Sequence, residues 1–151
     1  TRRRSRGTRR LFLVVCVGAL LLGASAKADA PSGRFVVSNG VILDTVTLLT
    51  WQQQSTDETA HVGFDDAYAR CAQLTLGQKK WRLPTLPELH TIVDERRTQP
   101  ALDPVFKGGG FHWSGTLYRG VAGIHWGMET ATGHTVFKHD TDLAATVRCV
   151  Y

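Results

Sequence analysis

The N-terminal stretch of this chain limits the fold to the residues that follow it. Six arginines between Arg2 and Arg10 form a basic head, and an uncharged, largely apolar run then extends over residues 11–24. Small residues follow at Ala26, Ala28 and Ala30. This order is typical of a cleavable secretory signal peptide, and the run is shorter than the ~20 apolar residues that a membrane span needs. We expect a signal peptide over residues 1–28, one domain over residues 29–151 and no membrane span in the mature form.

Removing the signal peptide reverses the sign of the net charge. The whole chain has 18 lysines and arginines against 13 acidic residues, a net charge of +5. Seven of the basic residues and none of the acidic ones lie within residues 1–28, which leaves 11 basic against 13 acidic residues, or −2. The basic character therefore belongs to the export signal, and we expect no nucleic-acid partner.

Two cysteines remain in the mature part, Cys71 and Cys149, at a separation of 78 residues. An even number of cysteines in an exported chain favours a disulfide. A bridge that closes a loop of this length stabilises the fold on the order of 4 kcal/mol, because it restricts the unfolded chain. Two buried free thiols are the alternative. We expect the protein to be periplasmic or extracellular.

The apolar pattern of the first half predicts short strands and then a helix. Strands are expected at 34–37, 41–43 and 48–53, with Asn39-Gly40 as the turn between the first two. Apolar side chains recur at spacings of three and four at Phe64, Ala67, Tyr68, Cys71 and Leu74. This spacing predicts an amphipathic helix that has Cys71 on its buried face and ends at Gly77.

The second half predicts one more helix and then strands. Thr85 and Glu88 form a capping box, and an apolar face follows at Leu86, Leu89, Ile92 and Val93. Gly108 to Gly110 are expected to form a flexible hinge. Strands are expected at 111–116, 124–130, 134–138 and 146–150. The order of strands, two helices and strands predicts an α+β domain with an antiparallel sheet and one disulfide.

Six segments of the mature chain also match one set of motifs in order. They are Gly40 to Gln52, Phe64 to Leu74, Trp81 to Leu89, Pro100 to Phe106, Trp113-Ser114 and Val147 to Val150. Together they resemble the Lcl C-terminal domain family, a bacterial family of unassigned function named after a collagen-like adhesin. The resemblance implies a C-type-lectin-like fold and pairing of Cys71 with Cys149. The adhesin that names the family implies surface attachment and glycosaminoglycan binding.

The chain also departs from its relatives. It has no collagen-like Gly-x-y repeat and none of the sugar-binding motifs of calcium-dependent lectins. The Arg82 to Thr85 segment is similar to one in formylglycine-generating enzymes, which share the broad architecture. Those enzymes use a pair of reactive cysteines near the C-terminus, where this chain has Cys149 alone, and this puts their oxidase chemistry in doubt.

Aromatic and basic residues are the candidate ligand contacts. Trp51, Trp81 and Trp113 are expected in the core, whereas Tyr118 and Trp126, near the predicted hairpin, are expected at the surface, where they could stack on a sugar. Basic pairs occur at Lys79-Lys80 and Arg96-Arg97, where a sulfated glycan or a phosphate could bind, although such pairs are more often a solvated surface. Arg82 and Glu88 are expected to form an ion pair that positions a helix.

Histidines provide a weaker alternative, a metal site. The dipeptides His112-Trp113 and His125-Trp126 would place both histidines on one face if their strands paired in register. His134, His139 and Asp140 follow nearby. Their spacing matches no standard metal motif, so we expect no cofactor, although zinc and calcium stay open. Ser114 lacks the Gly-x-Ser-x-Gly setting of a nucleophile.

These features together favour an exported, non-catalytic binding or adhesion module. Its expected partner is a glycan, a polyanion or a protein of the cell envelope. Residues 108–123 and the adjoining hairpin are the expected binding surface, since irregular connections on a fixed scaffold usually carry recognition. Two alternatives stay open: an enzyme, either related to formylglycine-generating enzymes or metal-dependent, and a structural subunit of an envelope assembly.

Overall fold

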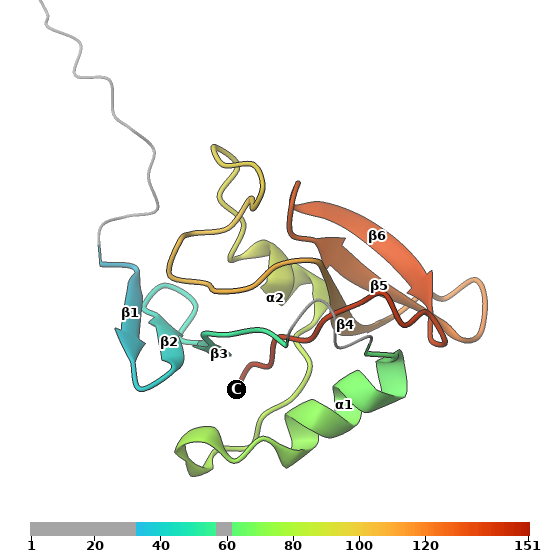
Figure 1. Cartoon of the computed structure of the whole chain (residues 1–151), viewed down its shortest axis with the longest axis horizontal. Helices are drawn as coiled ribbons and strands as arrows, with labels where there is room; N and C mark the ends of the chain where they lie inside the picture. Colours follow the sequence, from blue (N-terminus) through green and yellow to red (C-terminus); the bar gives the residue numbers. More distant parts are fainter. Residues whose placement is uncertain (1–32, 57–61) are drawn as a thin grey trace, which may run out of the picture.

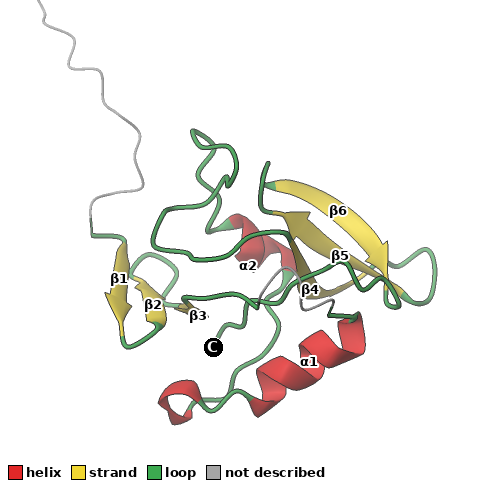
Figure 2. Ribbon diagram, in the orientation of Figure 1, coloured by secondary structure: helices red, strands yellow, loops and turns green. Residues whose placement is uncertain are grey.

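The computed structural model describes residues 33–56 and 62–151. The predicted signal peptide lies outside the described residues. Two three-stranded antiparallel sheets lie at opposite ends of the domain, and the C-terminal segment runs between them (Figure 1). Much of the chain between these sheets is irregular (Figure 2). The α+β prediction is confirmed, with two small sheets in place of one.

The first sheet contains β1 (Phe35–Ser38), β2 (Val41–Asp44) and β3 (Thr50–Gln52) in chain order. Asn39 and Gly40 form the predicted turn, and both have positive φ, as a tight two-residue hairpin turn requires. Strand β3 is shorter than predicted. The buried carboxylate of Asp44 accepts hydrogen bonds from Val46 N and Thr47 Oγ1, so the chain turns before it can extend.

Helix α1 (Phe64–Gln73) carries the disulfide. Ala67 and Cys71 are buried on its inner face, as the spacing predicts. Cys71 is bonded to Cys149, so the helix is tied to the C-terminal segment. Tyr68 was expected on this face, but it is 62% exposed, because at 3.6 residues per turn it lies about 100° around the helix from the buried Ala67. The helix also ends earlier than expected, and Gly77 instead lies in a short 3-10 turn, η2 (Leu76–Gln78).

Helix α2 (Leu86–His90) begins at the predicted capping box. Thr85 accepts from Glu88 N, and the Glu88 carboxylate accepts from Thr85 N at 2.7 Å. The helix is only five residues long, so Ile92 is buried from the following turn. The predicted burial of Leu89 and Ile92 is therefore confirmed, whereas the helix is shorter than predicted.

The second sheet contains β4 (Phe111–Leu117), β5 (Ile124–Glu129) and β6 (His134–His139) in chain order. Glu129 pairs with His134 across the predicted Thr132-Gly133 turn, and the register continues to Ile124 opposite His139. Helix α1 packs on β4, and helix α2 packs on β4 and β5.

The last residues were predicted as a strand, but they form separate bridges instead. Val150 pairs with both Trp51 and Arg82, and Thr146 pairs with His112. Each partner belongs to a different part of the fold, so no continuous ladder can form. The C-terminal segment is buried from Ala145 to Val150 and joins the two sheets.

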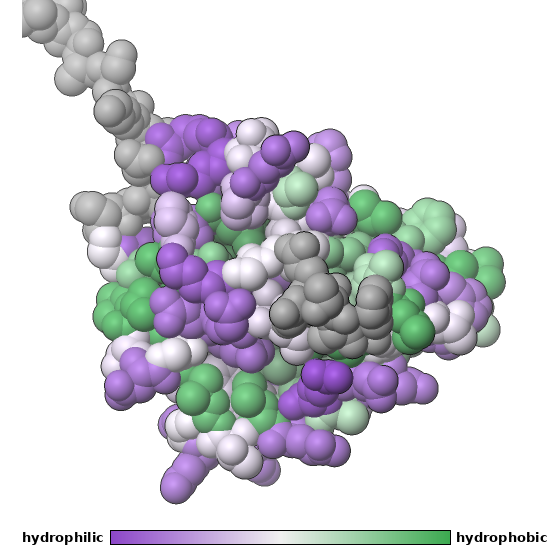
Figure 3. Space-filling model, viewed as in Figure 1, coloured by the Kyte–Doolittle hydropathy of each residue, from purple (hydrophilic) through white to green (hydrophobic). Residues whose placement is uncertain are grey.

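Two apolar clusters form the core. The first surrounds the disulfide and contains Trp81 and Trp113; the second contains Trp51, Leu89 and Met128. All three tryptophans predicted to be internal are buried, at 4% exposure or less. On the face of the molecule shown in Figure 3, hydrophobic atoms also reach the surface over β1–β2 and over the second sheet.

Candidate functional site

Three aromatic rings meet at the surface of the second sheet. Ring centroids lie 5.2 Å apart for Tyr118 and Trp126, 5.4 Å for Tyr118 and Phe137, and 5.7 Å for Trp126 and Phe137. Trp126 and Phe137 are paired residues of β5 and β6, and Tyr118 follows β4 directly. Phe137 is 52% exposed, and the other two rings are half-buried. We name these three residues the aromatic cluster.

The strand register places the aromatic cluster on the face of the sheet that α2 also covers. Side chains alternate along a strand, so Met128 shares a face with Trp126 and packs against Leu89 of α2. On the opposite face, His125 stacks on Phe64 of α1 at 3.3 Å between ring centroids. The aromatic cluster therefore lies on a scaffold held from both sides, with Phe137 as its most exposed ring.

Polar groups lie on the same face as the rings. Thr135 lies two residues from Phe137 on β6, and its Oγ1 lies 2.7 Å from His90 Nε2. His90 is exposed at the end of α2. Hydroxyl and imidazole groups beside aromatic rings supply both donors and acceptors for a polar ligand.

A glycine allows the Tyr118 ring to lie over its own loop. A Cβ at Gly120 would lie 2.8 Å from Tyr118 Cε1, closer than real Cβ atoms approach. The predicted binding surface over residues 108–123 contains β4, which agrees with the strand predicted at 111–116. The predicted hinge is also tethered, since Gly109 O accepts a hydrogen bond from Thr146 Oγ1.

The predicted basic residues do not join the aromatic cluster. Lys79 and Lys80 follow η2, and the Lys79 ammonium lies 5.5 Å from the Tyr151 ring centroid. Arg96 and Arg97 lie in the loop after α2, where both pair with Asp94. These two segments lie at opposite sides of the domain (Figure 1), so the four residues form no single basic surface.

The predicted histidines lie apart as well. His112 pairs with Met128, not with His125, so the proposed shared face does not form. His134 and His139 stand at the two ends of β6, where His139 Nδ1 lies 2.6 Å from Asp140 Oδ1. Within residues 33–56 and 62–151 no group of three or more histidine, cysteine or acidic side chains is arranged to hold a metal ion.

His112 instead belongs to a buried polar network around Arg148, which the sequence patterns did not single out. The fully buried guanidinium of Arg148 donates to Gln52 O at 2.7 Å, to Lys107 O at 2.7 Å and to Gln53 O. It also donates to His112 Nε2 at 3.2 Å, which leaves the proton on Nδ1, 2.8 Å from Thr146 Oγ1. Burial lowers the pKa of Arg148 to about 9, so it stays charged at neutral pH.

Catalytic candidates are occupied by structural bonds. Ser114 is buried, and its hydroxyl donates to Trp126 O at 2.6 Å. Cys71 and Cys149 are both consumed by the disulfide. Arg82 and Glu88 form the expected ion pair, with two contacts of 2.8 and 2.7 Å, and the partnership lowers the pKa of Glu88.

The comparisons with known proteins identify the family. The chain belongs to the Lcl C-terminal domain family, whose model matches residues 40–151. No curated protein and no solved structure gives a significant match. Neither helix in the described ranges is long and apolar enough to cross a bilayer.

Proposed function

We propose that the protein is an exported, non-catalytic binding module of the adhesion type, and that its aromatic cluster binds a glycan. The observation that carries this proposal is the contact of Tyr118, Trp126 and Phe137 on a solvent-facing part of the second sheet. Phe137 is 52% exposed, so its ring adds less to the core than a buried ring would and leaves a face open to a ligand.

Sugar recognition fits the chemistry of this surface. One face of a pyranose ring carries C–H groups with slight positive charge, and aromatic faces carry the complementary negative charge. The neighbouring Thr135 and His90 supply hydrogen-bonding groups for sugar hydroxyls. The mature chain has a net charge of −2, and its basic pairs are separated, so a neutral or weakly charged glycan fits better than a polyanion.

Export is supported by two independent features. The N-terminal sequence has the order of a secretory signal peptide. The disulfide between Cys71 and Cys149 is typical of an oxidising compartment. A periplasmic or extracellular location would give the module access to glycans of the envelope or of another cell.

The experiment is a glycan array probed with the oxidised mature protein, from Asp29 onward, in calcium and then in chelator. Neutral and sulfated glycans are both displayed. Each bound glycan is then titrated against Trp126→Ala, Phe137→Ala and the control Tyr68→Ala, which removes an exposed aromatic ring from α1. Losing one stacked ring costs up to about 1.5 kcal/mol, which is about a tenfold loss of affinity.

The proposal holds if both cluster variants lose affinity while Tyr68→Ala binds as the native protein does. Unchanged binding by both cluster variants contradicts it. Binding that falls steeply with salt and depends on Arg96 or Lys79 would instead identify a polyanion site. A silent array would turn the search toward a protein partner of the cell envelope.

A further inference from the structure

Strand β1 is an open edge of the first sheet. On the far side of this sheet, β3 is covered by the C-terminal segment, because Thr50 N donates to Tyr151 O and Gln52 N donates to Cys149 O. β1 pairs with β2 on one side, and within the described ranges no strand or bridge pairs with its other side. Figure 2 shows β1 at the margin of the domain, with β2 on its inner side. The first sheet can therefore be extended at β1 and not at β3.

The hydrogen-bond pattern shows which backbone groups of β1 point outward. Residues of a strand in an antiparallel sheet direct their backbone groups alternately to one side and to the other. Thr45 N donates to Arg34 O, so Arg34 and Val36 direct their groups toward β2. Phe35 and Val37 therefore direct theirs outward, where they make no backbone hydrogen bond within the described ranges. The N–H and C=O groups of both residues are available to an added strand.

The hairpin around this edge carries no net charge. Asp44 is the one charged residue between positions 35 and 56. Its carboxylate is fully buried and forms an ion pair with Arg34 at 2.7 Å. The exposed side chains of the region include five large hydrophobic ones, each at least 38% exposed: Val36, Val37, Leu43, Val46 and Leu48. Figure 3 shows hydrophobic atoms at the surface over β1–β2. A contiguous apolar surface of this kind is typical of an interaction site.

Strand β6, the outer strand of the second sheet, differs from β1. It contains Lys138 and has a histidine at each end, His134 and His139. Lysine on an edge strand opposes pairing with another chain, because the added strand would desolvate the ammonium group. β1 contains neither a charged residue nor a proline. Of these two edges, β1 is therefore the one that is open to pairing.

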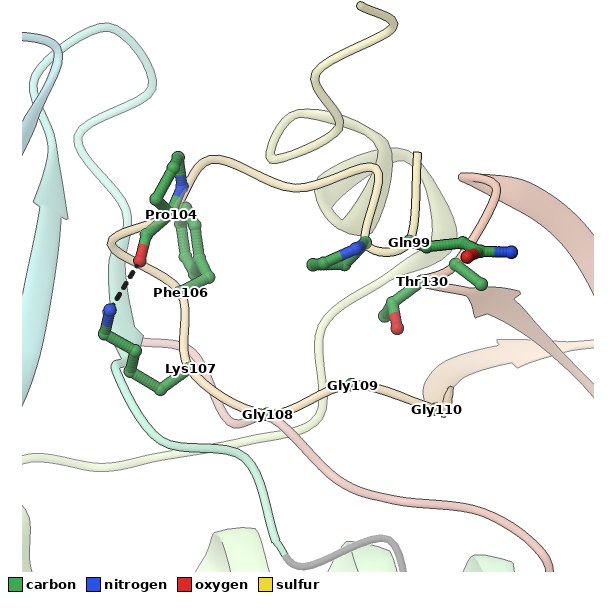
Figure 4. A pocket seen from close by; sticks show the side chains of 10 residues that line it. Gln99, Pro104, Phe106, Lys107, Gly108, Gly109, Gly110 and Thr130 are labelled. Carbon is green, nitrogen blue, oxygen red and sulfur yellow. Dashed lines mark hydrogen bonds between the residues drawn. The ribbon is translucent and has the colours of Figure 1, made fainter. Parts of the chain in front are cut away.

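The inner face of β1 is held in place by the rest of the domain. Phe35 packs edge-on against Phe106, with 5.0 Å between the ring centroids. Phe106 belongs to the segment that surrounds a hollow of about 540 Å³ (Figure 4). Arg34, directly before β1, donates to Thr91 O at 2.7 Å. A strand that is fixed before pairing loses little conformational entropy when a partner binds.

We propose that β1 pairs in antiparallel orientation with β1 of a second copy of this chain, which forms a symmetric dimer. The absence of charge on the hairpin selects a second copy as the partner. A two-fold axis brings a surface against itself, so a charged surface would meet its own sign, whereas this one meets no repulsion. The net charge of the mature chain, −2, adds little repulsion at long range. This proposal does not depend on the proposed glycan binding.

The outward backbone groups define the register of the dimer. Phe35 of each copy pairs with Val37 of the other, and two hydrogen bonds in each of these two pairs give four between the chains. Val36 then lies on the two-fold axis opposite its own copy, on the face of the sheet that Leu43 shares. β1 has four residues, so the interface is small and we expect a weak, reversible dimer. The second sheet lies at the opposite end of the domain, so the aromatic cluster of each copy stays open (Figure 1).

The test is sedimentation equilibrium of the oxidised mature protein, from Asp29 onward, at micromolar to millimolar concentrations. We expect the average mass to rise from that of the monomer toward that of the dimer. Val36→Lys and Val36→Glu each place like charges opposite one another at the axis, and each should weaken the dimer at least about tenfold. An equimolar mixture of the two variants should associate again, because opposite charges then meet.

Val136→Lys is the matched control, since it places the same charge at a part-exposed valine of β6, and it should leave the dimer unchanged. Val36 is 48% exposed, so its two variants should melt within a few degrees of the native protein. Three results would overturn the proposal: a native protein that stays monomeric up to millimolar concentration, a dimer that Val36→Lys leaves intact, or a mixture of the Lys and Glu variants that stays monomeric. A monomer that binds phosphatidylcholine vesicles through Val36 would also overturn it and would assign the surface to a lipid interface.

Discussion

Replacing Arg148 with methionine tests whether the buried guanidinium holds the two halves of the domain together. Methionine has a similar length and no hydrogen-bond donors, so it fills much of the space and removes four donated hydrogen bonds. The acceptors belong to β3 and the residue after it, to the loop before β4, and to β4 itself. The change therefore breaks contacts between segments that no continuous sheet joins.

The expected loss of folding stability depends on which hydrogen bonds each acceptor keeps when Arg148 is removed. Gln53 O keeps a bond from Lys107 N at 2.9 Å, and Lys107 O keeps one from Ser55 N at 3.0 Å. His112 Nε2 loses the donor that satisfies it, at about 1–3 kcal/mol. The other hydrogen bonds from the charged guanidinium are worth about 1.5–3 kcal/mol each. Replacing Arg148 also removes the desolvation cost of its buried charge, which offsets much of that loss. We expect a net loss of about 3 kcal/mol, from a stability that is about 5–15 kcal/mol for a typical domain.

Urea denaturation of the oxidised protein, followed by tryptophan fluorescence, measures this loss directly. The control is Arg119→Met, which removes an exposed arginine from the β4–β5 loop and should change stability by no more than about 0.5 kcal/mol. Arg148→Lys should fall between the two, because one ammonium cannot reach acceptors on all sides. An Arg148→Met variant less than about 1 kcal/mol below the native protein would refute the account of the network.

Three further predictions concern other parts of the fold. The double variant Cys71→Ser, Cys149→Ser should lose about 4 kcal/mol in urea denaturation, and a loss under about 1 kcal/mol would contradict the loop-closure argument. Burial and the nearby charged arginine hold the pKa of His112 well below its usual value, so the unfolded chain takes up a proton that the folded chain does not. Stability should therefore fall as the pH drops below about 6.5, by up to about 1.4 kcal/mol per unit, and His112→Gln should give a measurably shallower decline. Glu88→Ala removes half of the capping box and should cost about 1 kcal/mol by thermal melting, with Glu95→Ala, an exposed residue after α2, as the unchanged control.

Features coded by neighbouring residues could be predicted from the sequence. The Asn39-Gly40 turn and the Thr85–Glu88 capping box each depend on residues within four positions of one another. The burial of Cys71 follows from helical spacing, and its pairing with Cys149 follows from an even cysteine count and the family resemblance.

Features decided by tertiary contacts could not. Residues 146–150 have the apolar pattern of a strand, yet Val150 bridges two segments that belong to different parts of the fold. Leu48 was predicted within a strand, but it has a φ of 60° and is 76% exposed, because the Asp44 carboxylate organises a turn there. Nothing local to residues 146–150 distinguishes the bridges from a strand, whereas Asp44 was a local turn signal that the strand prediction did not use.

The candidate site lies between these cases. Tyr118 and Trp126 could be named from the sequence, whereas Phe137 was missed. Counting outward from a two-residue Thr132-Gly133 turn would pair Trp126 with His139, but the connection has four residues, 130–133, and this register pairs Trp126 with Phe137. Arg148 had a weaker signal, a charged residue within an otherwise apolar segment, and its partners come from distant positions that the sequence does not connect.

The way this fold is held together also bears on the role of the aromatic cluster. The strands are short, and α2 has five residues. The C-terminal segment joins the two sheets through the Arg148 network and single bridges, and the disulfide ties it to α1. The tryptophans Trp51 and Trp113 supply the large buried rings of the two cores. On the face of the second sheet that α2 also covers, Tyr118 and Trp126 are half-buried and Phe137 is 52% exposed. A ring that leaves half its surface in water adds less to stability than a buried one, and this is why the proposed glycan site is assigned to Phe137 and its neighbours, whereas Phe106 is buried in the second core.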